Sequence, residues 1–157
     1  MAEVKSNGQK YNDSYALVNS LNYYGYGCKP GSDWDYWTAY GVDNKDYELA
    51  QKQMLKTKKK YNQYRGVQMH QIYIKISYKE MSLLGERTIQ IAEKKLVDSL
   101  GQYFYSYGLQ NISFVYQNRI GIFVRMIVNS TSESSGKNIS NIKPFVDELN
   151  TLLNGLF

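Results

Sequence analysis

Residues 111–129 read NISFVYQNRIGIFVRMIVN and predict two antiparallel strands joined by a tight turn at Gln117-Asn118-Arg119. In the second strand, every other residue is a large apolar one, whereas the intervening positions are mixed. Side chains of a strand point alternately to opposite faces. We therefore expect Ile122, Val124 and Met126 to lie under helices, and Gly121, Phe123 and Arg125 to lie on an open face.

A further strand is predicted over Val67–Ser77, where Ile72, Ile74 and Ile76 share one face. Val67 and Met69 fall on the opposite phase, which suggests a bulge near His70 or Gln71. The alternation of apolar residues over Tyr15–Asn19 predicts another strand. A loop is expected over 25–35, which is rich in glycine and contains Pro30.

Three segments have the apolar spacing of helices, with ends marked by capping residues, glycine or proline: 45–62, 86–107 and the segment from Pro144 onward. Gly108 is expected to end the second helix in a left-handed conformation. The order is therefore β-α-β-α-β-β-α. It predicts an α+β fold in which an antiparallel sheet has helices packed mainly on one face.

The chain has 157 residues, 43% of them hydrophobic and 21% charged, which indicates one globular domain. We expect residues 1–13 to form a flexible polar arm and residues 14–157 to form the domain. No apolar run is long enough for a membrane span, and the polar N-terminus argues against a signal peptide. Cys28, the single cysteine, excludes an internal disulfide. A cytoplasmic protein without a cofactor is expected.

The formal net charge of +5 permits binding of nucleic acid without requiring it. The composition includes 16 tyrosines, which can stack on bases or fill a core. A coding bias toward tyrosine explains the same number without any function. Composition therefore leaves both interpretations open.

Several segments, taken in order, resemble the nuclease domain of conjugative relaxases of the MobP type. The quoted matches are Leu21-Asn22-Tyr23-Tyr24, Met69–Ser77 with Glu80, a helix over 89–107, Met126–Ser130, and Gly136-Lys137. The resemblance covers about three quarters of the chain and implies a relaxase-like fold. In that family, a histidine cluster holds a divalent metal beside the scissile phosphate, and a tyrosine is the nucleophile.

This sequence departs from the family pattern at every metal-binding position. Counted back from Asn129, the histidine positions fall on Tyr116, Gly121, Phe123 and Arg125. His70, the only histidine, lies elsewhere, and we expect it to be a structural residue of the sheet. A single histidine cannot build the site, and an arginine repels a metal ion. The resemblance thus implies a relaxase fold without its metal centre.

Tyr23 and Tyr24 match the tyrosine segment and are weak candidates for a nucleophile, because a tyrosine needs a base or a metal to ionise. Arg125, placed in mid-strand, is the leading candidate for a phosphate contact; alternatively, a carboxylate such as Glu80 or Glu86 pairs with it. The other candidate DNA-binding residues are Arg119, Lys56, Lys59, Lys60, Tyr116 and Trp34. For the lysine run at 56–60, which includes Lys58, a plain solvated helix end is the competing interpretation.

The leading hypothesis is a non-catalytic, relaxase-like DNA-binding accessory protein of a conjugative or mobilisable element such as a plasmid. Its partners would be single-stranded or origin-of-transfer DNA and a catalytic relaxase. An alternative is a protein–protein or homodimer module that docks on a relaxase or transfer complex without touching DNA. A weaker alternative is a tyrosine-dependent nicking enzyme.

Overall fold

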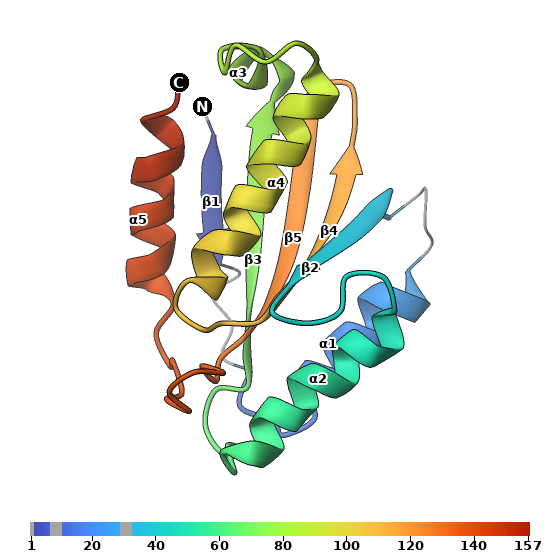
Figure 1. Cartoon of the computed structure of the whole chain (residues 1–157), viewed down its shortest axis with the longest axis vertical. Helices are drawn as coiled ribbons and strands as arrows, with labels where there is room; N and C mark the ends of the chain where they lie inside the picture. The colour runs from blue at the N-terminus through green and yellow to red at the C-terminus, as the bar shows by residue number, and fades with distance from the viewer. Residues whose placement is uncertain (1, 7–10, 29–32) are drawn as a thin grey trace.

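The computed structural model describes residues 2–6, 11–28 and 33–157 as an α+β fold (Figure 1). In these ranges the elements are β1 Glu3–Ser6, α1 Ala16–Asn22, the π-helix η1 Tyr23–Gly27, β2 Tyr36–Tyr40, α2 Tyr47–Lys60, β3 Met69–Ser77, α3 Tyr78–Ser82, α4 Ile89–Tyr105, β4 Asn111–Gln117, β5 Gly121–Asn129 and α5 Lys143–Asn154.

Within the described residues, five strands form one sheet in the order β1-β3-β5-β4-β2, and every neighbouring pair is antiparallel. The predicted β4–β5 hairpin is confirmed, with its turn at Asn118-Arg119-Ile120. The Asn118 side chain closes this turn by accepting hydrogen bonds from the backbone N–H groups of Ile120 and Gly121. The hairpin places β5 in the middle of the sheet, where it pairs with both β3 and β4.

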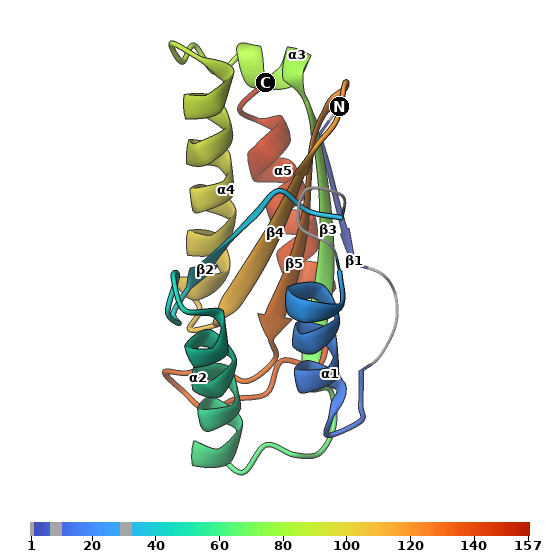
Figure 2. The ribbon, with the colours of Figure 1, turned by 90° about the vertical axis from the view of Figure 1, so that its right-hand side faces the viewer.

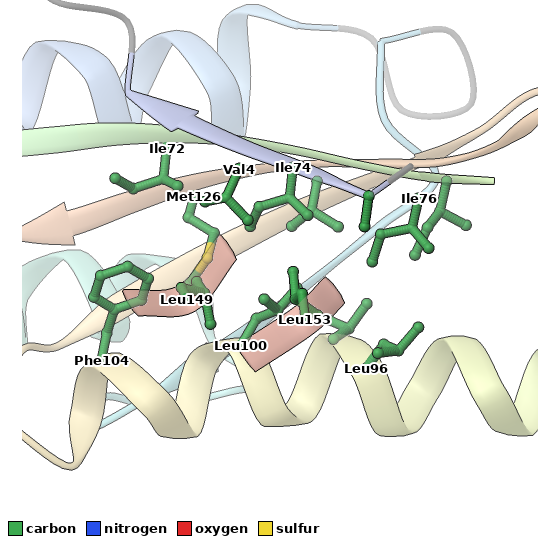
Figure 3. Close-up of a cluster of buried hydrophobic side chains, with 14 of the residues drawn as sticks. Val4, Ile72, Ile74, Ile76, Leu96, Leu100, Phe104, Met126, Leu149 and Leu153 are labelled. Atoms are coloured by element: carbon green, nitrogen blue, oxygen red, sulfur yellow. The ribbon is translucent and has the colours of Figure 1, made fainter. Parts of the chain in front are cut away.

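The main core lies between the sheet and the helices α4 and α5 (Figure 3). Alternate residues of β3 and β5, among them Ile72, Ile74 and Met126, meet Leu96, Leu100 and Phe104 of α4. Leu149 and Leu153 of α5 complete this core. Ile122, Val124 and Met126 are buried here, so the predicted register of β5 is confirmed.

A second core occupies the opposite face at one end of the sheet. Leu17 and Leu21 of α1 and Met54 of α2 pack there against Met69, Ile112 and Ile127. Figure 2 shows α1 and α2 together at the end of the molecule opposite α3. The prediction that helices lie mainly on one face is therefore wrong for this end, and only the remaining part of the second face is open.

The predicted strand over Tyr15–Asn19 is wrong, because Ala16–Asn22 is the helix α1. Leu17 and Leu21 are four residues apart and both buried, so a helical period of apolar residues overrides the short alternation. The strand β2 was not predicted. The short helix α3 was not predicted either, so the order of elements differs from the prediction near the N-terminus and after β3.

The predicted bulge in β3 is also wrong, because the β3–β5 register runs without interruption from Met69 opposite Asn129 to Ser77 opposite Gly121. Met69 and Ile72 lie on opposite phases since both faces of the sheet are covered at this end. The second core thus accounts for the change of phase that had suggested a bulge.

Part of the predicted flexible arm is ordered. Residues 3–6 form β1, which pairs with β3 at the edge of the sheet, whereas residue 1 and residues 7–10 of the arm lie outside the described residues. The predicted loop over 25–35 begins inside η1, and its residues 29–32 also lie outside the described part. Gly108 ends the α4 segment with φ of 77°, as predicted.

Candidate functional site

The second face carries two cross-strand rows of aromatic and charged side chains, which run from its open part to the edge of the second core at Phe114 and Trp37. Strand register fixes these rows, because directly paired residues of adjacent strands point to the same face. The first row is Lys5, Tyr73, Arg125, Phe114 and Trp37, and the second is Glu3, Lys75, Phe123 and Tyr116. In the first row the cations Lys5 and Arg125 alternate with rings, whereas in the second row Glu3 and Lys75 are followed by two rings.

These rows form the floor of a cavity of about 700 Å³, here called the aromatic hollow. Its floor includes Tyr73, Lys75, Tyr116, Phe123 and Arg125. Its wall is formed by Tyr23 and Tyr24 of η1 and by Trp34, which lies just before β2. A cavity of this size with several aromatic walls is large enough for a nucleobase and its phosphate.

The position of η1 over the hollow has a local cause. Tyr24 packs against Phe114 with ring centroids 5.7 Å apart, and its carbonyl oxygen accepts a 2.7 Å hydrogen bond from Trp34 Nε1. Gly25 allows the Tyr47 ring to approach η1, because a Cβ at Gly25 would lie 2.0 Å from that ring. These contacts fix the wall against the sheet.

Arg125 lies between two tyrosine rings. Its guanidinium carbon is 4.7 Å from the ring centroid of Tyr24 and 4.7 Å from that of Tyr73. Two aromatic faces hold the guanidinium by cation–π attraction and leave the N–H groups at its edge to bind acceptors.

The carboxylates considered for Arg125 bind elsewhere. Glu86 pairs with Lys95 at 2.6 Å, and Glu80 accepts a 2.9 Å hydrogen bond from the Ser77 hydroxyl. Within the described residues, Arg125 forms no ion pair. A carboxylate was one of the two partners expected for Arg125, and none is observed among the described residues. Two aromatic rings contact the guanidinium instead.

The charge of the hollow is mixed. Lys5, Lys75 and Arg125 line it together with Glu3 and Asp33. Glu3 is paired with Lys5 at 3.2 Å, whereas Lys75 Nζ lies over the Phe123 ring, 5.6 Å from its centroid. Both cations of the floor, Lys75 and Arg125, thus lie against aromatic rings. The floor thus presents positive charge between aromatic surfaces.

Tyr23 and Tyr24 both line the hollow, and their rings meet edge to face at 4.9 Å. Tyr24 is only 8% exposed, and burial raises the pKa of its hydroxyl while the Arg125 charge opposes that rise. A raised pKa makes ionisation harder, which disfavours Tyr24 as a nucleophile. Tyr23 is 59% exposed, so its ring is accessible for stacking.

The described residues contain no group of three or more His, Cys, Asp or Glu side chains placed to hold a metal ion. His70 is buried, and its Nε2 lies 2.7 Å from the carbonyl oxygen of Ile139. Burial lowers the pKa of His70, so it is a neutral structural residue, as expected from its place in the strand.

The other candidate DNA-binding residues divide into two sets. Tyr116 and Trp34 line the hollow, although Trp34 is mostly buried and packs on Phe114. Arg119 is exposed in the hairpin turn outside the hollow. Lys56, Lys59 and Lys60 are exposed on α2, and none of them lines the hollow.

The lysine run at the C-terminal end of α2 is separated from the hollow, as the position of Lys58 shows. Its Nζ reaches Ser130, just beyond the end of β5, whereas Phe123 in the hollow lies near the start of that strand. The two points are roughly 20 Å apart along the strand. The lysine run and Arg125 therefore do not form one surface.

Lys58 itself contradicts the interpretation of the run as a solvated helix end. It is 2% exposed, and its Nζ donates to Ser130 Oγ at 2.7 Å and Thr131 Oγ1 at 2.9 Å. Burial lowers the pKa of Lys58 to about 7. Its stem packs between α2 and the segment that follows β5, so this lysine has a structural role.

Sequence reasoning missed Tyr73, Lys75 and Lys5. The signal for the first two was present, because residues 71, 73 and 75 alternate with the buried isoleucines of β3. Lys5 carried no signal, since its strand was assigned to a flexible arm.

Comparisons with family models, with curated proteins and with solved structures find no match for this chain. Among the described residues, no helix combines the length and apolarity needed to cross a bilayer.

Proposed function

We propose that this protein binds single-stranded nucleic acid, with DNA as the expected partner, in the aromatic hollow and does not cleave it. The observation that carries this proposal is that the cations Arg125 and Lys75 lie against aromatic side chains in two neighbouring cross-strand rows. Proteins that bind single strands without cleaving them combine positive charge for the backbone with rings for the bases.

In this proposal Arg125 receives a phosphate group. A guanidinium held between two rings loses little conformational entropy when a phosphate binds, because the rings already fix its plane. Its edge N–H groups can donate to two phosphate oxygens at once. Lys75 lies on β3 two residues beyond Tyr73, the residue paired with Arg125, and supplies a second positive charge on the same face. Tyr23 and Tyr116 offer rings on which bases can stack.

The hollow favours a single strand over a duplex for a physical reason. Stacking on Tyr23 or Tyr116 needs a base whose face is free, and the bases of a duplex are already stacked on one another. The hollow is also concave and bounded by η1, so a rigid double helix cannot bring its bases to the floor.

The biological role that we propose is that of an accessory protein of a conjugative or mobilisable element. It rests on the resemblance of the chain to relaxases and on the absence of histidine from the positions of their metal ligands. The raised pKa of the Tyr24 hydroxyl also supports a role without nicking, because it makes the tyrosine a poorer nucleophile.

The test is the affinity of Arg125→Ala for labelled single-stranded oligonucleotides, measured by fluorescence anisotropy across a range of salt concentrations. Removing one phosphate contact should weaken binding roughly tenfold and lower the slope of log affinity against log salt by about 0.7. The matched control is Arg119→Ala, which removes the same charge outside the hollow and should change affinity much less.

Thermal unfolding of both variants is measured in parallel. Arg125→Ala also removes two cation–π contacts, so a modest fall in melting temperature is expected. Equal losses of affinity in the two variants would contradict a specific site. Failure of the wild-type protein to bind any single strand at low salt would overturn the proposal and favour a protein–protein module.

A further inference from the structure

The two edges of the sheet differ in whether their outward backbone groups are hydrogen-bonded. An edge strand turns the backbone N–H and C=O groups of alternate residues outward, where they can pair with another chain. β1 forms one edge of the sheet, and β2 forms the other. Folded proteins usually protect such edges, so a difference between them is informative.

The edge at β1 is closed by α5. Asn150 Oδ1 accepts a 2.8 Å hydrogen bond from the Val4 N–H, and Asn150 Nδ2 donates to the Val4 carbonyl oxygen at 2.6 Å. Asn154 Nδ2 donates to the carbonyl oxygen of Ala2 at 3.2 Å. These two side-chain amides occupy the positions that a neighbouring strand would take, so β1 cannot readily accept another strand.

The edge at β2 has no such cover among the described residues. No side chain in the described ranges bonds the outward backbone groups of residues 36–40. The sequence Tyr-Trp-Thr-Ala-Tyr carries no charge, proline or glycine, which are the usual means of blocking an edge. A groove of about 360 Å³ runs along this edge between β2 and α4. Figure 2 views the molecule from the side on which β2 crosses β4.

We infer that β2 pairs with β2 of a second copy of this chain, antiparallel and around a two-fold axis at Thr38. This arrangement sets Tyr36 against Tyr40 and Trp37 against Ala39, so each large ring meets a ring or a small residue. A two-fold interface uses the same surface on both copies, which a single self-complementary strand satisfies.

The helix beside this edge carries charges that suit the same arrangement. Lys94 and Asp98 of α4 border the groove and lie 3.0 Å apart on successive turns. If the α4 helices of two copies approach antiparallel to one another, Lys94 of each copy faces Asp98 of the other. The opposite charges attract on both sides of the axis, so the helix surface is complementary to itself.

The dimer has a consequence for the molecule as a whole. The axis of an antiparallel strand pair is perpendicular to the sheet, so two five-stranded sheets become one continuous sheet. Both aromatic hollows then open on the same side. The interface does not depend on the proposed binding function, because none of its residues except Trp37 belongs to the rows of the hollow.

The test is the solution mass of the wild type, Thr38→Lys and Thr151→Lys, measured by sedimentation and by light scattering. In a dimer of Thr38→Lys, the two new lysines face each other at the axis and repel. Within each chain, the new lysine lies beside Glu93 and Asp98, so the fold of the single chain can accept it. Thr151→Lys makes the same chemical change on the exposed surface of α5. We expect a dimeric wild type, a monomeric Thr38→Lys and a dimeric Thr151→Lys.

A second pair of variants tests the interface without altering the strand. Lys94→Asp should weaken the dimer, and combining it with Asp98→Lys should restore it, because the double variant exchanges the two charges. A monomeric wild type would refute the proposal that a second copy pairs with β2. The edge would then be open to a strand of another protein. A dimer that survives both Thr38→Lys and Lys94→Asp would place the interface elsewhere. Arg125→Ala should leave the mass unchanged, which separates this result from the binding test.

Discussion

At the scale of single residues, Arg125 shows how far a strand pattern can predict a site. Its place on the open face follows from two-residue alternation in β5, and the structure confirms that phase. The alternation could not show what surrounds the guanidinium. Tyr73 comes from a neighbouring strand and Tyr24 from η1, about a hundred residues earlier in the chain. The partners of a charged residue are set by tertiary contacts.

Lys58 shows the opposite case, in which composition suggested the wrong environment. It belongs to a run of lysines at the end of α2, and the others at 56, 59 and 60 are exposed. One position in such a run can point inward, because successive helical residues are about 100° apart. Ser130 and Thr131, far away in sequence, provide the two hydroxyl acceptors that make the burial tolerable.

The buried amine of Lys58 predicts a pH dependence of stability. The pKa of Lys58 falls to about 7 in the folded protein, whereas an unfolded lysine titrates near ~10.4. Below pH 7 the folded state bears the full cost of burying a charge, and that cost is relieved as pH rises toward 10. The unfolded state binds more protons between these values, so stability increases with pH.

We expect the free energy of unfolding to rise between about pH 7 and about pH 9, by up to ~1.4 kcal/mol per pH unit relative to Lys58→Met. Urea denaturation of both proteins across this range measures the difference. Lys59→Met, which replaces an exposed neighbour, should keep the wild-type slope. An identical slope in wild type and Lys58→Met would show that Lys58 is not the group responsible.

At the scale of elements, long segments with a clear period were predicted well and short ones were not. The helices α2 and α4 and the strand β3 lie within the predicted ranges, and α5 and the β4–β5 hairpin differ from the prediction by one residue at their ends. Each has enough residues to repeat its period several times. α1 and β2 are short, and the tertiary environment decides their state. In α1 the contact of Leu17 and Leu21 with the second core selects the helix.

At Gly121, the strands β3 and β5 approach each other so closely that a side chain has no room. A Cβ at Gly121 would lie 2.0 Å from the carbonyl oxygen of Ile76 and 2.7 Å from the Cα of Ser77. The contact between β3 and β5 therefore leaves no room for any side chain at this position. Glycine is required here for steric reasons, whatever the function of the face.

We therefore expect Gly121→Ala to destabilise the protein by about 1–3 kcal/mol, because the added methyl group forces β3 and β5 apart. Chemical denaturation monitored by circular dichroism measures this change. Gly155→Ala is the control, since Gly155 ends α5 with φ of −69° and a Cβ there meets nothing closer than 3.3 Å. A stability equal to that of the wild type in Gly121→Ala would contradict the close approach of the two strands.

At the scale of the whole molecule, the two cores divide the second face of the sheet. The helices α1 and α2 cover one end, and the aromatic hollow occupies the rest. The site is therefore bounded by a wall that the sequence-based fold did not contain. That wall supplies Tyr23, Tyr24 and Trp34, so its position turns an open sheet face into a concave site.

We predict that the protein does not nick supercoiled plasmid in the presence of magnesium or manganese. This prediction follows from the proposed function and from the sequence, which contains a single histidine, His70, and from the described residues, which hold no cluster of side chains that could bind a metal ion. Agarose gel electrophoresis of plasmid incubated with the wild type, Tyr23→Phe and Tyr24→Phe measures the outcome. Metal-dependent nicking that disappears in either tyrosine variant would refute this prediction and establish an enzyme.

By itself, the sequence determined the α+β class, the hairpin, the phase of β5 and the lack of a histidine cluster. These features are local, because they depend on residue identity and on periods of two or 3.6 residues along one segment. The tertiary structure alone decided the order of the strands, the cover of both faces, the burial of Lys58 and the rings around Arg125. Each of these joins residues far apart in the chain, and no local period specifies which distant segments will exclude water together.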